Sequence, residues 1–302
     1  MTGINKRAFI LGSTRSGTTL LESLMGAHPR IKAFPESSFF ICSIGQIDNR
    51  VCDKSEVSLK NRLGRPLSNA RVHLGIPHRG LTQKCMREFL ASINRTELMN
   101  EFPVNSNSMT VLSNAFVQML DRLAMEDGKE LWVEKSPMHL FYVDEITRYV
   151  KSAKFINIVR NGSDVVASLF DASRLYPEHW WWSRFASLDA CVNHWNHSLK
   201  SLLTNQGKAN HITICYEQLV DATPFVLQKL CAFLETEYDE AMLVDYRTVA
   251  TSVSVGEPWR AKTSDVIANA NGEKFRTLLT ESQQAYVAER LAAVDYSQFS
   301  LS

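Results

Sequence analysis

The stretch that decides the fold is "FILGSTRSGTTLLESLMGAHP", residues 9–29. It starts with apolar residues typical of a buried strand, passes through a turn rich in glycine and hydroxyl side chains, and ends in an amphipathic helix. This order is typical of a phosphate-binding loop, in which the unpaired N–H groups of the first helical turn bind an anion. We therefore expect a strand to end at Gly12 and a helix to begin at Thr18.

The loop departs at one position from the nucleotidase pattern G-x-x-x-x-G-K-[ST]. Gly12 and Gly17 have the required spacing and Thr19 supplies the last hydroxyl, but Thr18 stands where that pattern has lysine. Arg15, inside the turn, adds a planar and permanently charged group suited to oxyanions. The sequence therefore predicts an anion site that combines Arg15 with the backbone and hydroxyl groups of Ser16, Gly17, Thr18 and Thr19.

Short apolar strands alternate with helices along the rest of the chain, which predicts an α/β fold with a P-loop-like central parallel sheet flanked by helices. Near-continuous apolar strands such as "FINIV" fit a sheet covered on both faces. The expected strands are Ala8–Leu11, Leu131–Val133, Phe155–Val159 and His211–Cys215. The expected helices are Thr18–Ala27, Ser108–Met125, Pro137–Val150, Ser163–Ser173 and Leu188–Thr204, and from about Pro224 onward we expect further helices with one polar loop near Ser254–Ser264.

The bulk composition is that of an ordinary globular domain. The 302 residues are 45% hydrophobic and 22% charged, with a net charge of +1, so any anion site must come from local clusters rather than a global field. We find no linker and predict one domain over residues 1–302. No apolar run reaches the roughly 18 residues that a membrane helix needs, and "AFIL" near the start is too short for a signal peptide.

Six scattered cysteines show no C-x-x-C pair and no metal-like spacing with histidine: Cys42, Cys52, Cys85, Cys191, Cys215 and Cys231. We interpret them as reduced thiols and the protein as cytoplasmic. Residues 60–87 form a basic excursion with seven lysines or arginines, two histidines and no acid. This segment is either a solvated and partly mobile loop, or an acceptor or lid loop that attracts an anionic substrate.

A second anion cluster is expected after the strand "FINIV". A kinase or NTPase would use an acidic residue at such a strand end to hold magnesium, whereas here the strand is followed by Arg160. Ser168 lies about two turns into the next helix and could reach the same anion if the helix start packs close by. Two cationic strand ends indicate a nucleotide with phosphates at two places, neutralised by protein cations and not by a metal. Taken singly, Arg160 could equally form a surface ion pair and Ser168 could bond to its own helix.

These residues resemble a known family. "GSTRSGTTLL" followed by "KFINIVRNGSDVVAS" is similar to the two motifs with which sulfotransferases bind PAPS, 3'-phosphoadenosine 5'-phosphosulfate. The arginine form "RSGTT" resembles the tyrosylprotein and bacterial branch more than the cytosolic branch. "AHPRIKAFPESSFF", "WVEKSPMHL", "ITICYEQLV" and "EPWRAKTSD" follow in the family's order, so the resemblance spans roughly residues 8 to 265.

The resemblance implies a role for each matching residue in binding PAPS as donor and PAP as product. Arg15 with residues 16–19 would hold the 5'-phosphosulfate, and Arg160 with Ser168 the 3'-phosphate. Tyr216 would lie against the adenine. Arg260 and Lys262 would close over the nucleotide, in a loop whose alignment is loose.

Glu36 matches the catalytic glutamate of the tyrosylprotein branch, but Ser38 and Cys42 stand where that branch has further arginines. This difference argues against an acidic peptide acceptor. We expect Glu36 to take the acceptor's proton, since a partly buried carboxylate can act as a base. Arg15 and Lys135 are expected to stabilise charge on the leaving phosphate, because sulfuryl transfer depends on positioning and electrostatics; Lys135 follows a strand, where open α/β sheets bind ligands.

His139 and His28 are alternative bases, since histidine titrates near neutrality. His28 is better interpreted as a cap after the first helix, while the choice between Glu36 and His139 stays open. "HWWWSRF", residues 179–185, contains Trp180, Trp181 and Trp182. These tryptophans form either a lid or core plug, or an aromatic wall for the acceptor.

The predicted function is metal-independent, in-line transfer of a sulfuryl group from PAPS to a hydroxyl or amine of a small molecule. The alternatives are a P-loop kinase-like phosphotransferase and a nucleotide-binding module without catalysis. We expect no nucleic-acid partner and no membrane span. The sequence leaves open the acceptor, the choice of O- or N-sulfation and the oligomeric state.

Overall fold

The computed structural model describes residues 4–45, 50, 70–253, 267 and 273–301. A five-stranded parallel sheet runs through its centre in the order β2-β3-β1-β4-β5. The strands are β1 (Lys6–Gly12), β2 (Ile31–Phe34), β3 (Leu131–Lys135), β4 (Ala153–Val159) and β5 (His211–Cys215). The predicted α/β class with a P-loop-like parallel sheet is confirmed.

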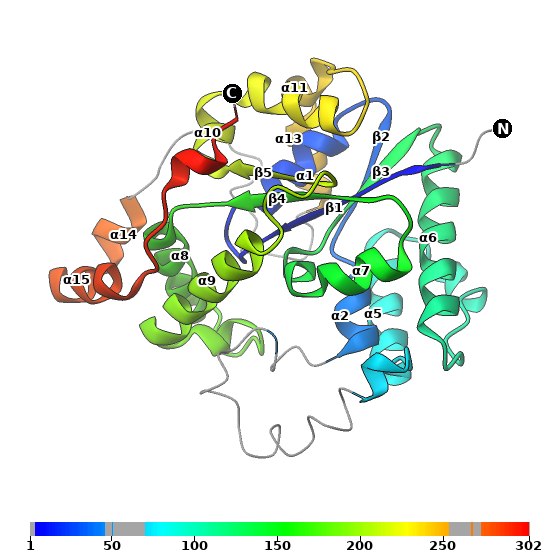
Figure 1. The fold of residues 1–302 in the computed structure, drawn as a ribbon, viewed down its shortest axis with the longest axis horizontal. Helices are drawn as coiled ribbons and strands as arrows, with labels where there is room; N and C mark the ends of the chain where they lie inside the picture. The colour runs from blue at the N-terminus through cyan, green and yellow to red at the C-terminus, as the bar shows by residue number, and fades with distance from the viewer. Residues whose placement is uncertain (1–3, 46–49, 51–69, 254–266, 268–272, 302) are drawn as a thin grey trace.

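Helices cover both faces of this sheet (Figure 1). The longer helices are α1 (Thr18–Gly26), α5 (Arg79–Ser92), α6 (Met109–Glu126), α8 (Gly162–Leu175), α9 (Leu188–Leu203), α11 (Thr223–Phe233), α13 (Tyr246–Val253) and α15 (Glu281–Arg290). The shorter ones are α2 (Phe39–Ile44), α7 (Val143–Tyr149), α10 (Tyr216–Asp221), α12 (Ala241–Val244) and α14 (Glu273–Leu278). Single 3₁₀ turns occupy η1 (Thr96–Asn100), η2 (Pro137–Tyr142), η3 (Trp182–Phe185) and η5 (Tyr296–Phe299).

Each strand divides its apolar side chains between two cores, because successive residues point to opposite faces. In β1, Phe9 joins the core that contains α5, α6, α8 and α9, whereas Ile10 joins the core that contains α1 and α11. Both side chains are completely buried. Burial on both faces explains why the strands read as continuous apolar runs and not as alternating ones.

The structure differs from the sequence prediction in three places. β2 was not predicted, and it lies at the edge of the sheet beside β3. The single helix expected over Pro137–Val150 is instead η2 followed by α7. Part of the predicted basic excursion is helical, since residues 79–87 are the first nine of the 14 residues of α5. Residues 60–69 of that segment lie outside the described part of the chain.

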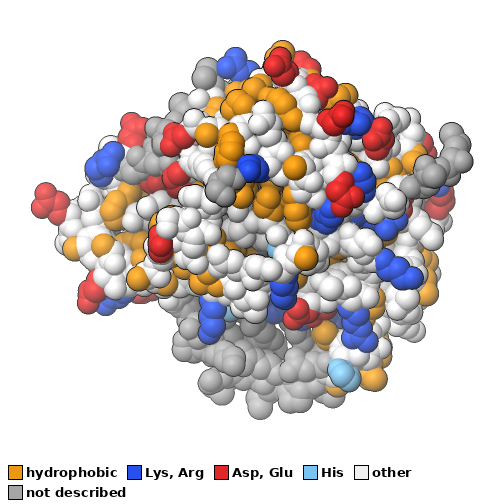
Figure 2. Space-filling model, turned by 45° about the horizontal axis from the view of Figure 1, so that its top comes forward, with side chains coloured by type: hydrophobic (Ala, Val, Ile, Leu, Met, Phe, Trp, Pro, Cys, Tyr) orange, Lys and Arg blue, Asp and Glu red, His pale blue; other side chains and the backbone are white. Residues whose placement is uncertain are grey.

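The described helices include none that is long and apolar enough to cross a membrane. Figure 2 shows acidic and basic side chains interspersed over one face of the molecule, which agrees with the small net charge. The single-domain organisation over residues 1–302 stays a prediction.

Candidate active site

The turn between β1 and α1 brings backbone N–H groups together as expected. Gly17 has a φ of +91°, in the left-handed region that glycine tolerates best. Arg15 also has a positive φ, +74°, a strained conformation that is often found at functional sites. α1 then begins at Thr18, so the unpaired donors of its first turn face the space next to this loop.

The second predicted anion cluster lies next to the first, because β1 and β4 are neighbouring strands with Gly12 opposite Ile158. A Cβ added to Gly12 would lie 2.6 Å from the Ile158 carbonyl oxygen, which shows how closely the two strand ends approach. Arg160 follows β4 and donates from Nη1 to the Arg15 carbonyl oxygen at 3.5 Å. Arg15 Nε in turn donates to Ser168 Oγ on α8 at 3.0 Å. The two clusters therefore share one site.

Tyr216 completes one side of this site. It is the first residue of α10, directly after β5, and the Arg160 guanidinium lies 4.2 Å from its ring centroid. A Cβ on Gly17 would come within 2.3 Å of the Tyr216 ring. The aromatic ring thus packs against the glycine of the anion loop, leaving no room for any larger side chain there.

Lys135 and Glu36 face each other on the opposite side. Lys135 ends β3 and only 1% of its side chain is exposed, while Glu36 lies in the loop before α2 and is 35% exposed. Their charged atoms, Lys135 Nζ and Glu36 Oε2, are 3.8 Å apart. A second carboxylate, that of the fully buried Glu22 on α1, lies 3.4 Å from the same Nζ. The two predicted residues, Glu36 and Lys135, therefore belong to one cluster of charged side chains.

A cavity of about 1100 Å³ joins these parts. Eight predicted or matching residues line it together with Arg15: Gly17, Thr18, Thr19, Glu36, Lys135, Arg160, Ser168 and Tyr216. Ser16 is buried just behind the wall. The predicted residues Arg260 and Lys262 lie outside the described part of the chain.

Comparisons with known proteins agree with this arrangement. Residues 7–240 match the model of the family described as "Sulfotransferase family". The chain belongs to the sulfotransferase family. A protein-tyrosine sulfotransferase of Drosophila melanogaster is 22% identical over 240 residues, which cover 78% of this chain and only 39% of that relative's length.

Two solved sulfotransferase domains share the fold. The domain from the Synechococcus PCC 7002 olefin synthase has a TM-score of 0.59 and 22% identity, covering 96% of this chain and 95% of that domain. The domain from the curacin biosynthetic pathway has a TM-score of 0.57 and 20% identity, covering 96% and 97%. The resemblance drawn from the motifs is thereby confirmed at the level of the family and its fold.

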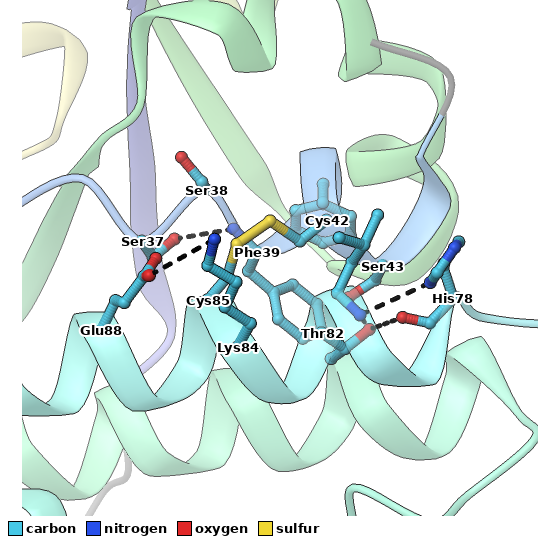
Figure 3. The surroundings of a disulfide bond; sticks show 12 residues. Ser37, Ser38, Phe39, Cys42, Ser43, His78, Thr82, Lys84, Cys85 and Glu88 are labelled. Carbon is cyan, nitrogen blue, oxygen red and sulfur yellow. Dashed lines mark hydrogen bonds and ion pairs between the residues drawn. A yellow bond between two sulfur atoms is a disulfide. The ribbon is translucent and has the colours of Figure 1, made fainter. Parts of the chain in front are cut away.

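The far end of the cavity is walled by α2 and α5, which a disulfide bond joins. Cys42 and Cys85 are bonded with their Cα atoms 6.5 Å apart, and both line the cavity. Figure 3 shows the bond lying between the two helices. A further link runs from Thr82 Oγ1, which donates to Ser43 Oγ at 3.1 Å.

The prediction that the cysteines are reduced thiols is therefore wrong for Cys42 and Cys85. The two residues are far apart in sequence, but the packing of α5 on α2 brings their Cα atoms within the range that a disulfide spans. Cys191, Cys215 and Cys231 are free and buried. Burial raises the pKa of Cys191 to about 12, so its thiol is unreactive. The thiol argument for a cytoplasmic location no longer holds, and that location stays a prediction.

The three tryptophans differ in their exposure. Trp182 is 3% exposed and packs under the guanidinium of Arg15, 5.9 Å from its ring centroid, whereas Trp180 is 62% exposed. All three line the cavity. Trp182 is thus buried in the core beside the anion loop, whereas Trp180 is largely exposed; a role of these tryptophans as a wall for the acceptor stays a prediction.

The sequence reasoning missed Glu134, which organises the loop that carries Glu36. Glu134 is fully buried and its Oε1 accepts hydrogen bonds from Ser37 N at 3.0 Å, and from Ser37 Oγ and Ser136 Oγ at 2.6 Å each. Burial opposes ionisation of this carboxyl, but His139 and the two serine hydroxyls outweigh it and hold the pKa of Glu134 below its usual range. The loop is thereby fixed to the end of β3.

The two alternative bases, His139 and His28, both have structural partners. His139 Nδ1 lies 3.1 Å from Glu134 Oε2 and its Nε2 accepts from Phe40 N at 3.2 Å. His28 Nε2 bonds to the Glu237 carbonyl oxygen at 2.8 Å, and its Nδ1 accepts from Arg30 N at 3.0 Å. Neither histidine is among the residues that line the cavity. Geometry therefore favours Glu36, which does line it.

No group of three histidine, cysteine, aspartate or glutamate side chains is arranged to hold a metal ion within the described ranges. Metal independence stays a prediction from the sequence.

Proposed function

We propose that the protein transfers a sulfuryl group from PAPS to a hydroxyl or amine of a small molecule. One observation carries this proposal: two cation-bearing strand ends, at Arg15 and Arg160, meet at the same cavity that Lys135 and Glu36 enter from the other side. Two neighbouring cationic sites suit a nucleotide with phosphates at both its 5' and 3' positions. Lys135 and Glu36 add a cation for the charge on the leaving phosphate and a carboxylate that can accept the acceptor's proton, which are the two groups that the transfer requires.

The residues present fit a 3'-phosphorylated adenosine. Ser16 Oγ is buried and has no hydrogen-bond partner among the described residues, as expected for a donor that awaits a phosphate oxygen. Gly17 keeps the backbone of the anion loop open where a side chain would collide with Tyr216. Arg160 and Ser168 would hold the 3'-phosphate, and the Tyr216 ring would support the adenine. PAPS supplies an activated sulfuryl group whose bond to the 5'-phosphate breaks during transfer.

The chain's own residues would then act on the acceptor and on the leaving group. Glu36 Oε2 takes the proton from the acceptor hydroxyl or amine while the acceptor's oxygen or nitrogen forms its bond to sulfur. Arg15 and Lys135 place positive charge beside the phosphate oxygen that receives the electrons of the broken bond. The products are the sulfated acceptor, PAP and a proton on Glu36. The loop held by Glu134 keeps Glu36 in position for this step.

The apolar part of the cavity wall favours an acceptor with an apolar body. Ile41 on α2, Phe89 on α5 and Met138 on η2 line it together with Trp181. Ser38 and Cys42 stand where the tyrosylprotein branch has arginines, and Cys42 is bonded to Cys85. A wall of this kind offers apolar contact area and little positive charge, so it suits a small apolar alcohol or amine better than an acidic peptide.

Calorimetric titration distinguishes the donor classes. We expect PAP to bind without added magnesium and ATP to bind at least tenfold more weakly. Magnesium-dependent preference for ATP would instead support the kinase-like alternative. Incubation with ³⁵S-labelled PAPS and a set of apolar alcohols and amines should then identify an acceptor by transfer of the label.

The variants Glu36→Gln and Lys135→Ala test the catalytic assignment. We expect each to lower turnover at least a hundredfold, which is within the usual contribution of a general base or a charge stabiliser. The Kd for PAP should change less than fivefold in Glu36→Gln, because Glu36 is assigned to the acceptor. In Lys135→Ala the Kd for PAP should rise, because Lys135 is placed beside the 5'-phosphate that PAP keeps. Glu130→Gln, a change at an exposed glutamate, serves as the control. Loss of PAP binding in Glu36→Gln, or unchanged turnover in either variant, would contradict the catalytic assignment. A wild-type protein that binds PAP but turns over no acceptor would support the alternative of a nucleotide-binding module without catalysis.

A further inference from the structure

Lys135 is held between two carboxylates that differ in their surroundings. Its Nζ lies 3.4 Å from Glu22 Oε2 and 3.8 Å from Glu36 Oε2. Glu36 lines the cavity, while Glu22 is completely buried and lies behind the wall. One carboxylate therefore contacts the lysine from the side of the substrate, and the other contacts it from the protein interior.

The alternation of β3 explains how this arrangement arises. Leu131 and Val133 point into the core beneath α1, and Lys135, two residues further on, points the same way. Glu22 lies in the second turn of α1, next to the buried Leu21. α1 therefore brings the carboxylate of Glu22 next to the last side chain of β3, which is that of Lys135.

Burial makes this contact important for both partners. A carboxylate with no exposed surface is costly to ionise unless a cation lies close by. The Lys135 ammonium is such a cation, and it is itself almost fully buried. Each group thereby compensates the charge of the other, and the position of the ammonium is fixed from the side that the substrate does not reach.

We propose that Glu22 is a positioning residue that holds the Lys135 ammonium at the edge of the cavity. This proposal rests on the function proposed for Lys135. With Glu22 as the inner counterion, the ammonium keeps a carboxylate partner and its position when Glu36 takes the proton of the acceptor. Lys135 can then stay directed toward the leaving phosphate throughout the transfer.

The first test uses Glu22→Gln, which keeps the shape of the side chain and removes its charge. With ³⁵S-labelled PAPS and an alcohol identified by the screen above, we expect kcat to fall ten- to a hundredfold. The KM for PAPS and the Kd for PAP should change less than threefold. Glu22→Asp, which keeps the charge at a shorter reach, should recover part of the lost kcat, and Glu130→Gln should keep the wild-type value.

A double-mutant cycle with Lys135→Met shows whether Glu22 acts through the lysine. In the Lys135→Met background, Glu22→Gln should change kcat less than twofold. An equal fold-loss in both backgrounds, or an unchanged kcat in Glu22→Gln alone, would overturn the proposal. So would a wild-type kcat in Lys135→Met, because no positioning role then remains.

A second cycle, on urea unfolding of the same four proteins, needs no turnover. Glu22→Gln and Lys135→Met should each lower the folding equilibrium constant. In the double variant, the fold-decrease of this constant should be at least tenfold smaller than the product of the two single fold-decreases. Absence of this coupling would overturn the proposed contact itself. If the two substitutions are coupled but the wild type transfers no label, the Glu22–Lys135 contact is confirmed and the proposed function is wrong. The positioning role of Glu22 is then wrong too, because it depends on that function.

Discussion

At the scale of single residues, the site depends on a few positions where the backbone or a charge has an unusual environment. Gly17 and Arg15 have positive φ values within one turn, and Lys135 and Glu134 are charged residues buried at the end of one strand. Each such feature costs free energy unless neighbouring groups compensate it. Arg15, Gly17 and Lys135 line the cavity and Glu134 is buried next to Lys135; the compensating groups are the anion loop, the facing carboxylates and the serine hydroxyls.

Gly17→Ala tests the close approach of Tyr216 to the anion loop. The substitution adds the cost of a left-handed residue, about 1 kcal/mol or more, and a Cβ that would lie 2.3 Å from the aromatic ring. We expect the free energy of unfolding to fall by about 2–4 kcal/mol and PAP binding to weaken at least tenfold. Urea unfolding and calorimetry measure the two effects.

Gly128→Ala is the matched control for this prediction. Gly128 also has a positive φ, +69°, but a Cβ there would meet nothing within 4 Å. In this control the free energy of unfolding should fall only by the cost of the left-handed backbone, about 1 kcal/mol. The control should bind PAP as the wild type does. Equal losses in the two variants would show that the Tyr216 contact is unimportant.

Prediction from the sequence identified the cations at the strand ends but missed the two buried glutamates beside them. Arg15, Arg160 and Lys135 follow apolar strands, and the carboxyl ends of parallel strands meet at one edge, so their grouping could be predicted. Glu134 and Glu22 carry no such signal. A glutamate within an apolar pattern looks like a solvent-facing residue until the structure shows which neighbours surround it.

At the scale of elements, the predicted strands were found and the short edge strand was missed. β2 has only four residues, "IKAF", and its two middle residues are half-buried, so it lacks the apolar run that marked the other four strands. The packing of α5 on α2 was also beyond prediction, because α5 begins inside a basic segment that reads as a loop. That packing decides where Cys42 and Cys85 meet.

Removal of the disulfide between these elements should destabilise the protein. The bond closes a loop of 43 residues, and constraining a loop of this length in the unfolded chain is worth ~4 kcal/mol in the chain-entropy model. We expect Cys42→Ser/Cys85→Ser to lower the free energy of unfolding by about 2–4 kcal/mol in urea. Reductant should lower the stability of the wild type by a similar amount and leave the double variant unchanged.

Thiol titration provides the independent control for the disulfide. The unfolded wild type should expose two more reactive thiols after reduction than before, and the double variant should show no such increase. An unchanged thiol count in the wild type, together with stability that does not respond to reductant, would contradict the bond between α2 and α5.

At the scale of the whole molecule, two helix-covered cores support the sheet, and one of them contains an unusual buried histidine. His194 on α9 packs against Phe185, with ring centroids 5.1 Å apart, and near Trp181 at 6.5 Å. Neither of its ring nitrogens has a hydrogen-bond partner among the described residues. Burial, and to a lesser extent the charge of His197, lower the pKa of His194 to about 3.

This histidine should make the protein sensitive to acid. In the unfolded chain the pKa of histidine is about 6.5, so between pH 6.5 and pH 3 the unfolded state binds a proton that the folded state does not. Stability is therefore fully present above pH 6.5 and falls as the pH drops, by up to ~1.4 kcal/mol per pH unit from this residue. His211, whose pKa burial and the charge of Lys208 lower to about 4, adds to the same decline.

His194→Phe separates the contribution of this residue from the rest of the acid response, since an aromatic ring fits among Phe185 and Trp181 and takes up no proton. Urea unfolding at pH 7.5, 6.0, 5.0 and 4.0 should show that the free energy of unfolding of the variant declines less steeply with falling pH than that of the wild type. The difference in slope should correspond to about one proton, because the unfolded variant has one fewer group to protonate. His73→Phe, a change at an exposed histidine, should keep the wild-type slope. Parallel curves for the wild type and His194→Phe would mean that position 194 accepts a proton in the folded core, and the acid sensitivity of the molecule would then have to come from elsewhere.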